Sequence, residues 1–254
     1  MKFPTGWLVA FLAWAGCVQA GEVSVAVAAN FTAPMQKIAS AFMLDTGHKA
    51  TLSFGSTGKF YAQIKNGAPF QVLLAADDET PARLEKEGVT VNGTRFPYAI
   101  GKLVLWSKQP GLVDDRGAVL KSARFDHIAL ADPKLAPYGV AAIEVMDHLG
   151  LQTALRPKLV QGENIGQAFQ FVVSESVPLG FVALSQVWAD GKLSQGSVWL
   201  IPEQLYAPLR QDAVLLASAR DHPAAVALMA YLRGPKARAI IQSFGYEFPN
   251  TGAL

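Results

Sequence analysis

The chain has 254 residues, with 22 lysines and arginines against 20 acidic residues, four histidines and one cysteine. Hydrophobic residues make up 51% and charged residues 17%, which excludes a disordered chain, because disorder needs low hydrophobicity and high net charge. A formal net charge of +2 without a cluster of basic residues excludes a nucleic-acid-binding surface. One cysteine cannot form a disulfide within the chain. The composition predicts one large or two modest packed domains.

Residues 1–20 have the pattern of a secretory signal peptide. Lys2 starts it, an apolar stretch too short to span a bilayer of about 30 Å follows, and small residues lead up to Ala20. We predict cleavage after Ala20 and export of the mature chain. Two alternatives stay open: a buried N-terminal helix, and lipidation at Cys17 as in bacterial lipoproteins, which we rank below simple cleavage.

The first half of the mature chain alternates strand-like and helix-like segments. Apolar, β-branched runs predict strands, and segments with an apolar helical face predict helices. In chain order we predict a strand at 22–29, a helix at 30–46, a strand at 50–54, a helix at 59–65, a strand at 72–75 and a helix at 80–87. Asn30 is predicted to cap the first helix. This order predicts a parallel sheet with helices on its faces.

The remaining chain predicts a second set of strands and helices. The strands are expected at 98–107, 128–130, 179–184 and 211–217, and the helices at 141–150, 165–175, 223–233 and 236–244. We predict two α/β lobes, one of residues 22–97 plus 207–254 and the other of residues 98–206. This discontinuous arrangement rests partly on the family resemblance given below.

Small residues with hydroxyl or amide groups gather where strands are followed by helices. Four such junctions stand at residues 30–32, 54–58, 136–139 and 162–166. In open α/β sheets ligands bind beyond the carboxyl ends of strands, where helix N-termini attract anions. Lys59 is the one basic residue close to these junctions. Together they indicate a small oxyanion held by neutral donors, although each junction alone also fits ordinary helix caps and turns.

Two enzyme motifs are partly matched at residues 56–59 (STGK). Ser56 and Lys59 fit the S-x-x-K of penicillin-recognising serine enzymes, but neither S-D-N nor K-T-G follows. The phosphate-binding P-loop motif is not matched, because this segment lacks the first glycine and the final serine or threonine of the motif. The histidines lack metal-ligand spacing, and the acidic residues 77–79 fit the start of a helix better than a metal site. A serine hydrolase using Ser56 and Lys59 stays a remote alternative.

Several short segments carry a family resemblance through their order and spacing. They are AANFTA at 28–33, FGSTG at 54–58, NGAP at 66–69, AAD at 75–77, IGKLVLW at 100–106, ADP at 131–133, APYG at 136–139, LGFVA at 179–183, LRGP at 232–235 and FGY at 244–246. The chain resembles the periplasmic molybdate-binding component of bacterial ABC importers, a type II periplasmic binding protein. This resemblance implies a two-lobed α/β fold, each lobe a mostly parallel sheet flanked by helices, with the ligand in the cleft between the lobes.

The resemblance also implies a function. It implies hinged capture of molybdate or tungstate in the periplasm, with no cofactor and no catalysis, and delivery to a membrane permease. We expect a monomer. A binding protein of the same fold for another anion, such as sulfate or an organic anion, is the nearest alternative.

The resemblance implies particular residues for the site. The positions implied to hold the anion are Asn30, Ser56, Thr57, Gly58, Tyr138 and Ile165. Thr57 would supply a hydroxyl, Tyr138 its N–H or its hydroxyl, and Ile165 its backbone N–H. Ala183 stands where many members of the family carry a donating tyrosine.

Overall fold

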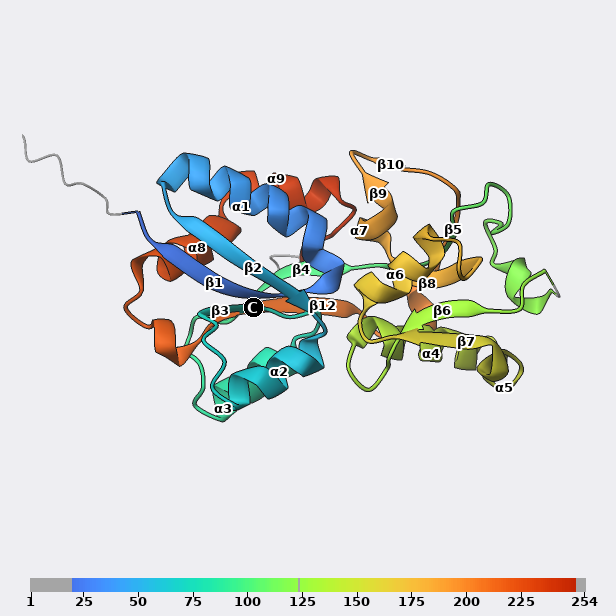
Figure 1. The fold of residues 1–254 in the computed structure, drawn as a ribbon, viewed down its shortest axis with the longest axis horizontal. Coiled ribbons are helices and arrows are strands. Elements are labelled where there is room, and N and C mark those ends of the chain that lie inside the picture. The colour runs from blue at the N-terminus through green and yellow to red at the C-terminus, as the bar shows by residue number, and fades with distance from the viewer. Residues whose placement is uncertain (1–19, 123, 250–254) are drawn as a thin grey trace, which may run out of the picture.

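Two five-stranded sheets lie side by side along the long axis of the molecule, each flanked by helices (Figure 1). The computed structural model describes residues 20–122 and 124–249. The predicted signal peptide up to residue 19, including Cys17, lies outside these residues. The arrangement is the two-lobed α/β fold expected from the sequence.

The first sheet has the strand order β2–β1–β3–β12–β4. Its strands are β1 (Glu22–Ala28), β2 (Lys49–Gly55), β3 (Val72–Leu74), β4 (Phe96–Gly101) and β12 (Leu209–Leu215). β1 runs parallel to β2 and β3, whereas β12 runs antiparallel to β3 and β4. Val25 and Leu73 are fully buried, as expected for central strands with helices on both faces.

Helices cover both faces of this first sheet (Figure 1). One face carries α1 (Thr32–Thr46), α8 (Pro223–Arg233) and α9 (Pro235–Ser243), and the other carries α2 (Thr57–Lys65) and α3 (Glu79–Lys86). The first face packs Phe31, Ile38 and Phe42 into its core, and the second packs Phe60 and Leu84.

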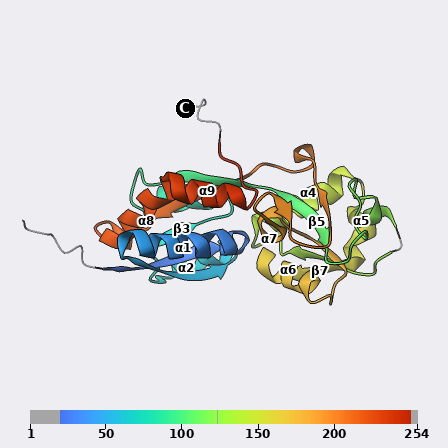
Figure 2. The same cartoon turned by 90° about the horizontal axis from the view of Figure 1, so that it is seen from above.

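The second sheet has the strand order β11–β5–β8–β6–β7. Its strands are β5 (Leu103–Ser107), β6 (Ile128–Ala131), β7 (Leu159–Gly162), β8 (Leu179–Ala183) and β11 (Ser197–Leu200). β6 is parallel to β7 and β8, while β5 is antiparallel to β8 and β11. The helices α4 (Pro137–His148) and α6 (Ile165–Val173) pack on its opposite faces (Figure 2).

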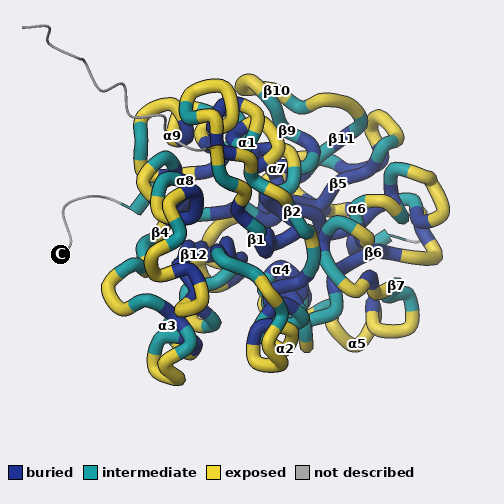
Figure 3. Tube along the Cα trace, turned by 60° about the vertical axis from the view of Figure 1, so that its left-hand side comes forward, coloured by how far each residue is buried: buried dark blue, intermediate teal, exposed yellow. Residues whose placement is uncertain are grey.

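The remaining helices, strands and turns of the described residues are short. They are α5 (Gln152–Leu155), α7 (Leu184–Val187), β9 (Trp188–Ala189), β10 (Lys192–Leu193) and the 3₁₀ turns η1 (Ala29–Phe31), η2 (Ala118–Lys121), η3 (Arg156–Lys158), η4 (Glu203–Leu205) and η5 (Ala217–Ala219). The buried residues lie mainly along the strands of the two sheets, and exposed residues lie on loops and outward helix faces (Figure 3). No helix within residues 20–122 and 124–249 is long and apolar enough to cross a membrane.

The single strand predicted at 98–107 is wrong. It is two strands, β4 in the first sheet and β5 in the second, with Lys102 between them. The apolar run continues through the crossing without a turn residue that would mark the break, since Gly101 lies within β4. We keep the division into two lobes as a proposal, with this crossing moved from Tyr98 to Lys102.

Candidate functional site

A small cavity of about 10 Å³ lies between the two lobes, where strand ends of both sheets meet helix starts. Its lining comprises Ala28, Ala29, Asn30, Gly55, Ser56, Thr57 and Ala76 from the first lobe and Ala136, Pro137, Tyr138, Asn164 and Ile165 from the second. This volume holds about one water molecule. All four junctions expected from the sequence contribute to this one cavity.

Three helices begin at the cavity wall. α2 begins at Thr57, α4 at Pro137 and α6 at Ile165, so three positive helix ends face one small space. Proline at the first position of α4 has no N–H, which makes the N–H of Tyr138 the first donor of that helix. The N–H of Ile165 likewise precedes the intrahelical ladder, where backbone donors need an outside partner.

The hydroxyl of Ser56 has no hydrogen-bond partner among the described residues, although the side chain is 3% exposed. Ser56 occupies the cap position of α2 but makes no capping bond. A buried hydroxyl without a partner is unfavourable, so this atom is available to an incoming ligand. Its neighbour Thr57 accepts a hydrogen bond from the N–H of Ala76 at 2.9 Å, which leaves the Thr57 hydroxyl hydrogen free to donate.

Asn30 does not cap α1 as predicted. The chain makes the 3₁₀ turn η1 before α1, and Phe31 rather than Asn30 holds the cap position. The Asn30 side chain is buried, and its Nδ2 donates to Gln211 Oε1 at 2.8 Å and to the Tyr246 hydroxyl at 2.9 Å. Within the part of the chain that the structure describes, Asn30 Oδ1 has no partner.

Tyr138 lines the cavity, but its hydroxyl is engaged elsewhere. It accepts a hydrogen bond from Gln211 Nε2 at 3.2 Å. Burial raises the pKa of the Tyr138 phenol well above its ordinary value, so the hydroxyl stays protonated. Ala183, where the resemblance implies a donating tyrosine in many members, is fully buried and outside the cavity lining; its N–H donates to Gln186 Oε1 at 2.9 Å.

Gly58 is the one predicted site residue that does not line the cavity. Its N–H donates to the carbonyl of Leu135 in the other lobe at 3.0 Å. A Cβ atom added at position 58 would lie only 3.1 Å from the carbonyl oxygen of Leu135. Gly58 therefore joins the two lobes, and it lines the larger groove next to the cavity.

Lys59 does not line the cavity and forms an ion pair across the lobes. Its Nζ lies 2.6 Å from Glu163 Oε2, and the two side chains are 42% and 61% exposed. The Ser56 hydroxyl and the Lys59 amine make no hydrogen bond among the described residues. The nucleophile–base contact that a serine hydrolase needs is therefore not made.

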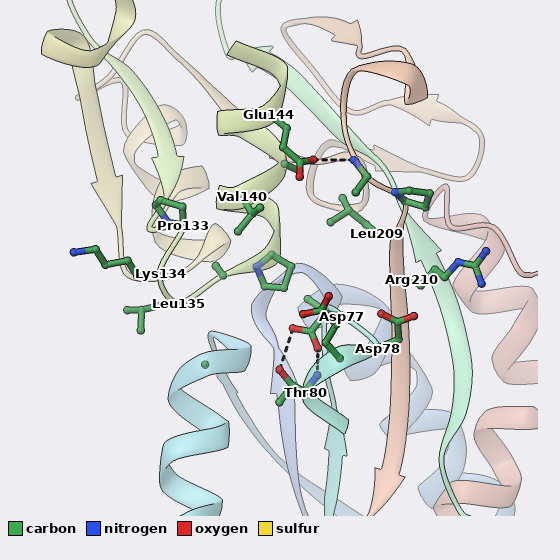
Figure 4. Close-up of a pocket in the computed structure, with 18 residues that line it drawn as sticks. Asp77, Asp78, Thr80, Pro133, Lys134, Leu135, Val140, Glu144, Leu209 and Arg210 are labelled. Atoms are coloured by element: carbon green, nitrogen blue, oxygen red, sulfur yellow. Dashed lines mark hydrogen bonds between the residues drawn. The ribbon is translucent and has the colours of Figure 1, made fainter. Parts of the chain in front are cut away.

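A larger groove of about 330 Å³ lies beside the cavity and shares Ala76, Ala136 and Pro137 with its wall (Figure 4). Its charged side chains are Asp77, Asp78, Glu79, Glu144, Lys134 and Arg210. Asp77 accepts hydrogen bonds from the N–H and the hydroxyl of Thr80, drawn in Figure 4. Burial raises the pKa of Asp77 to about 6. Acidic side chains outnumber basic ones in this groove and repel an anion. The groove is therefore a less favourable anion site than the small cavity.

Metal ligation is not supported in the described part of the chain, where no group of three or more His, Cys, Asp or Glu side chains could hold a metal ion. The cavity lining carries only neutral groups within the described residues. A cavity of this kind can bind a small anion through oriented dipoles.

A buried polar network beside the cavity was not predicted from the sequence. It joins Tyr98, Ser185, Gln211 and Tyr246 to Asn30 and Tyr138. These residues lie in six separate segments, and Tyr98 fitted the core equally well. No local sequence pattern could therefore indicate the network.

Two α/β lobes that close on a neutral cavity define a solute-binding protein. The family model described as bacterial extracellular solute-binding protein matches residues 23–247, and the chain belongs to this family.

Relatives in this family are similar over nearly the whole chain. The molybdate-binding protein ModA of Azotobacter vinelandii is 62% identical over 228 residues, covering 90% of both chains. ModA of Rhodobacter capsulatus is 52% identical over 227 residues, covering 89% of this chain and 88% of the relative. The solved structure of an Azotobacter vinelandii periplasmic molybdate-binding protein has a TM-score of 0.87 at 43% identity, covering 90% of this chain and all of the other.

Proposed function

We propose that this protein captures molybdate, and tungstate by the same chemistry, in the cavity between its lobes. The observation that carries the proposal is the buried, unpartnered hydroxyl of Ser56 among three helix N-termini. The 62% identity to a molybdate-binding protein supports the choice of anion. We further propose periplasmic location, action as a monomer, delivery to an ABC-type permease, and no catalysis.

Neutral donors suffice for a dianion in such a cavity. Each helix N-terminus contributes roughly half an elementary positive charge, and each hydrogen bond to a charged group contributes about 1.5–3 kcal/mol. Ser56, Thr57 and the N–H groups of Tyr138 and Ile165 are the donors that we propose. Because none carries a full charge, selectivity would depend on cavity size and donor geometry rather than on long-range attraction.

Binding requires the lobes to move. A tetrahedral anion with four oxygens is larger than the one-water space of about 10 Å³. The lobes would therefore open to admit the ligand and close around it with the lining residues shifted outward. The contacts across the lobes, such as Gly58 to Leu135 and Lys59 to Glu163, would break on opening and form again when the lobes close around the ligand.

Isothermal titration of the mature chain with molybdate, tungstate, sulfate and phosphate tests the proposal. We expect tight one-to-one binding of the two metal oxyanions and a rise in melting temperature with ligand, because ligand binds only the folded form. Tight binding of sulfate alone would favour the same fold serving another anion. No heat and no change in melting with molybdate would refute the assignment.

A further inference from the structure

Gly101, the last residue of β4, leaves a slot in the first lobe that the Tyr138 side chain fills. A Cβ atom added at position 101 would overlap the Tyr138 hydroxyl oxygen and would lie 3.1 Å from Cζ of the same ring and 2.5 Å from the Gln211 side-chain amide. The Gly101 backbone does not adopt the left-handed conformation that favours glycine. The absence of a side chain at Gly101 therefore serves the close approach of Tyr138, which is one of the uses of glycine in strands.

The Tyr138 phenol enters this slot from the other lobe. Tyr138 is the second residue of α4, which packs on the second sheet, whereas Gly101 and Gln211 belong to strands of the first sheet. Tyr138 is 1% exposed, and its hydroxyl lies 3.2 Å from the Gln211 side-chain amide. A phenol hydroxyl both donates and accepts, so it pairs with either atom of that amide. Shape and hydrogen bonding together make the slot a contact between the lobes.

The residue after Tyr138 fixes the same turn of α4 to its own lobe. A Cβ atom added at Gly139 would lie 2.8 Å from the Pro133 nitrogen and would overlap the carbonyl oxygen of Ala131 at the end of β6. Tyr138 and Gly139 thus hold the start of α4 between the two lobes. The Tyr138 N–H belongs to this turn and is one of the donors proposed for the anion. Such a donor is effective only when the packing around it holds it in place.

We propose that Gly101 is a positioning residue for the anion site, because its slot seats the Tyr138 phenol and thereby places the Tyr138 N–H at the cavity. This inference rests on the proposed function. It gives the two polar groups of Tyr138 different tasks. The hydroxyl anchors the start of α4 in the first lobe, and the N–H faces the anion. A side chain at position 101 would push the phenol out of the slot and shift that N–H away from the anion.

Gly101→Ala tests the slot by titration calorimetry with molybdate. We expect the affinity to fall about 10- to 100-fold, the effect of losing one hydrogen bond to a charged group. An affinity within about threefold of the wild type would overturn the proposal, because it would leave every such bond intact.

A size swap in the slot is the matched control. Tyr138→Phe removes the hydroxyl and keeps the ring and the backbone N–H. Gly101→Ala combined with Tyr138→Phe has a methyl group about where the hydroxyl was, and the Gln211 amide, at the end of a flexible side chain, shifts to make room. The double variant should bind molybdate within about threefold of Tyr138→Phe alone, because residues in contact couple. Equal losses on adding Gly101→Ala to either background would overturn the proposal, since residue 101 would then act without the Tyr138 hydroxyl.

Backbone amide resonances of the ¹⁵N-labelled protein separate positioning from a general loss of structure. A charge-assisted hydrogen bond is short and strong, so it moves the signal of the donating N–H downfield. In the wild type, the signals of Tyr138 and Ile165 should both move downfield with saturating molybdate. In Gly101→Ala the Tyr138 shift should largely be lost, while Ile165, at the start of α6, should keep its own. Equal reduction of both shifts would overturn the positioning role.

The remaining outcomes distinguish this inference from the proposed function. Failure of the wild-type protein to bind molybdate would overturn both, whereas unchanged affinity in Gly101→Ala would overturn this inference alone. If Gly101→Ala does not fold, Tyr138→Leu takes its place, because leucine empties the slot, adds no overlap and keeps the backbone N–H. Full molybdate affinity in Tyr138→Leu would then overturn the proposal.

Discussion

The N–H of Gly58 donates to the carbonyl of Leu135 at 3.0 Å and thereby joins the first turn of α2 to the loop before α4 in the other lobe. A Cβ at position 58 would lie 3.1 Å from that carbonyl oxygen and 3.3 Å from the Leu135 Cα. The closed arrangement therefore leaves little room for a side chain here, where two backbones meet across the lobes.

Gly58→Ala should separate the stability of the fold from the closure of the lobes. Alanine favours the helix by roughly 0.5–1 kcal/mol over glycine, so the melting temperature without ligand should hold or rise. Anion affinity should fall about 5- to 100-fold, because overpacking costs about 1–3 kcal/mol. Titration calorimetry and thermal melts measure the two effects. A parallel fall in both quantities would mean that the methyl group disturbs the fold and not only closure.

Ser56→Ala should lower anion affinity about 10- to 100-fold without destabilising the ligand-free protein, because the Ser56 hydroxyl makes no bond in the described structure. Thr57→Val is the matched comparison. It removes the acceptor of the Ala76 N–H and should cost about 1–3 kcal/mol of unfolding free energy. Urea unfolding with and without molybdate measures both. Full affinity in the serine variant would remove Ser56 from the site.

Lys59→Met should change anion affinity by less than about fivefold, and less still at high salt, because the Lys59–Glu163 pair is exposed. Glu163→Gln should behave alike. The variants also address the serine-hydrolase alternative, since a base at position 59 would be indispensable there. Loss of an ester- or lactam-cleaving activity on changing Lys59 would contradict a pure binding protein.

Asp77 predicts a pH dependence. Burial raises its pKa from an ordinary 3.8 to about 6 in the folded protein. A raised pKa means that the folded state holds the proton more tightly, so this contribution to stability is full below about pH 3.8 and is lost as the pH rises through about 6. Asp77→Asn should therefore be more stable than the wild type at neutral pH, and the difference should shrink towards pH 4, as urea unfolding would measure.

The same variant should bind the anion more tightly near neutral pH, because Asp77 lines the groove next to the cavity wall. The gain should disappear once the wild-type carboxyl is protonated, below about pH 6. Titration calorimetry of the wild type and of Asp77→Asn, from below pH 6 to neutral pH, measures the two affinities. Equal affinities at neutral pH would show that the Asp77 charge does not reach the site.

The sequence determined the parts of this protein that depend on neighbours in the chain. Alternation of apolar runs and capped helices predicted β1, α1, β2 and α2 to within a few residues. The four junctions were visible because small and hydroxyl residues follow strands, and five of the six predicted site residues line one cavity. Local periodicity and turn chemistry act over a few residues, so they can be read from the chain alone.

Only the tertiary structure decided what distant segments do to one another. The apolar run at 98–107 crosses between sheets at Lys102, because each half pairs with a different strand far along the chain. The buried polar network around Asn30 includes Gln211, which is 181 residues away. The bond from Gly58 to Leu135 in the other lobe was not predicted for the same reason. Hydrogen bonds and packing require proximity in space, and the closure of two lobes creates that proximity where the sequence gives no sign of it.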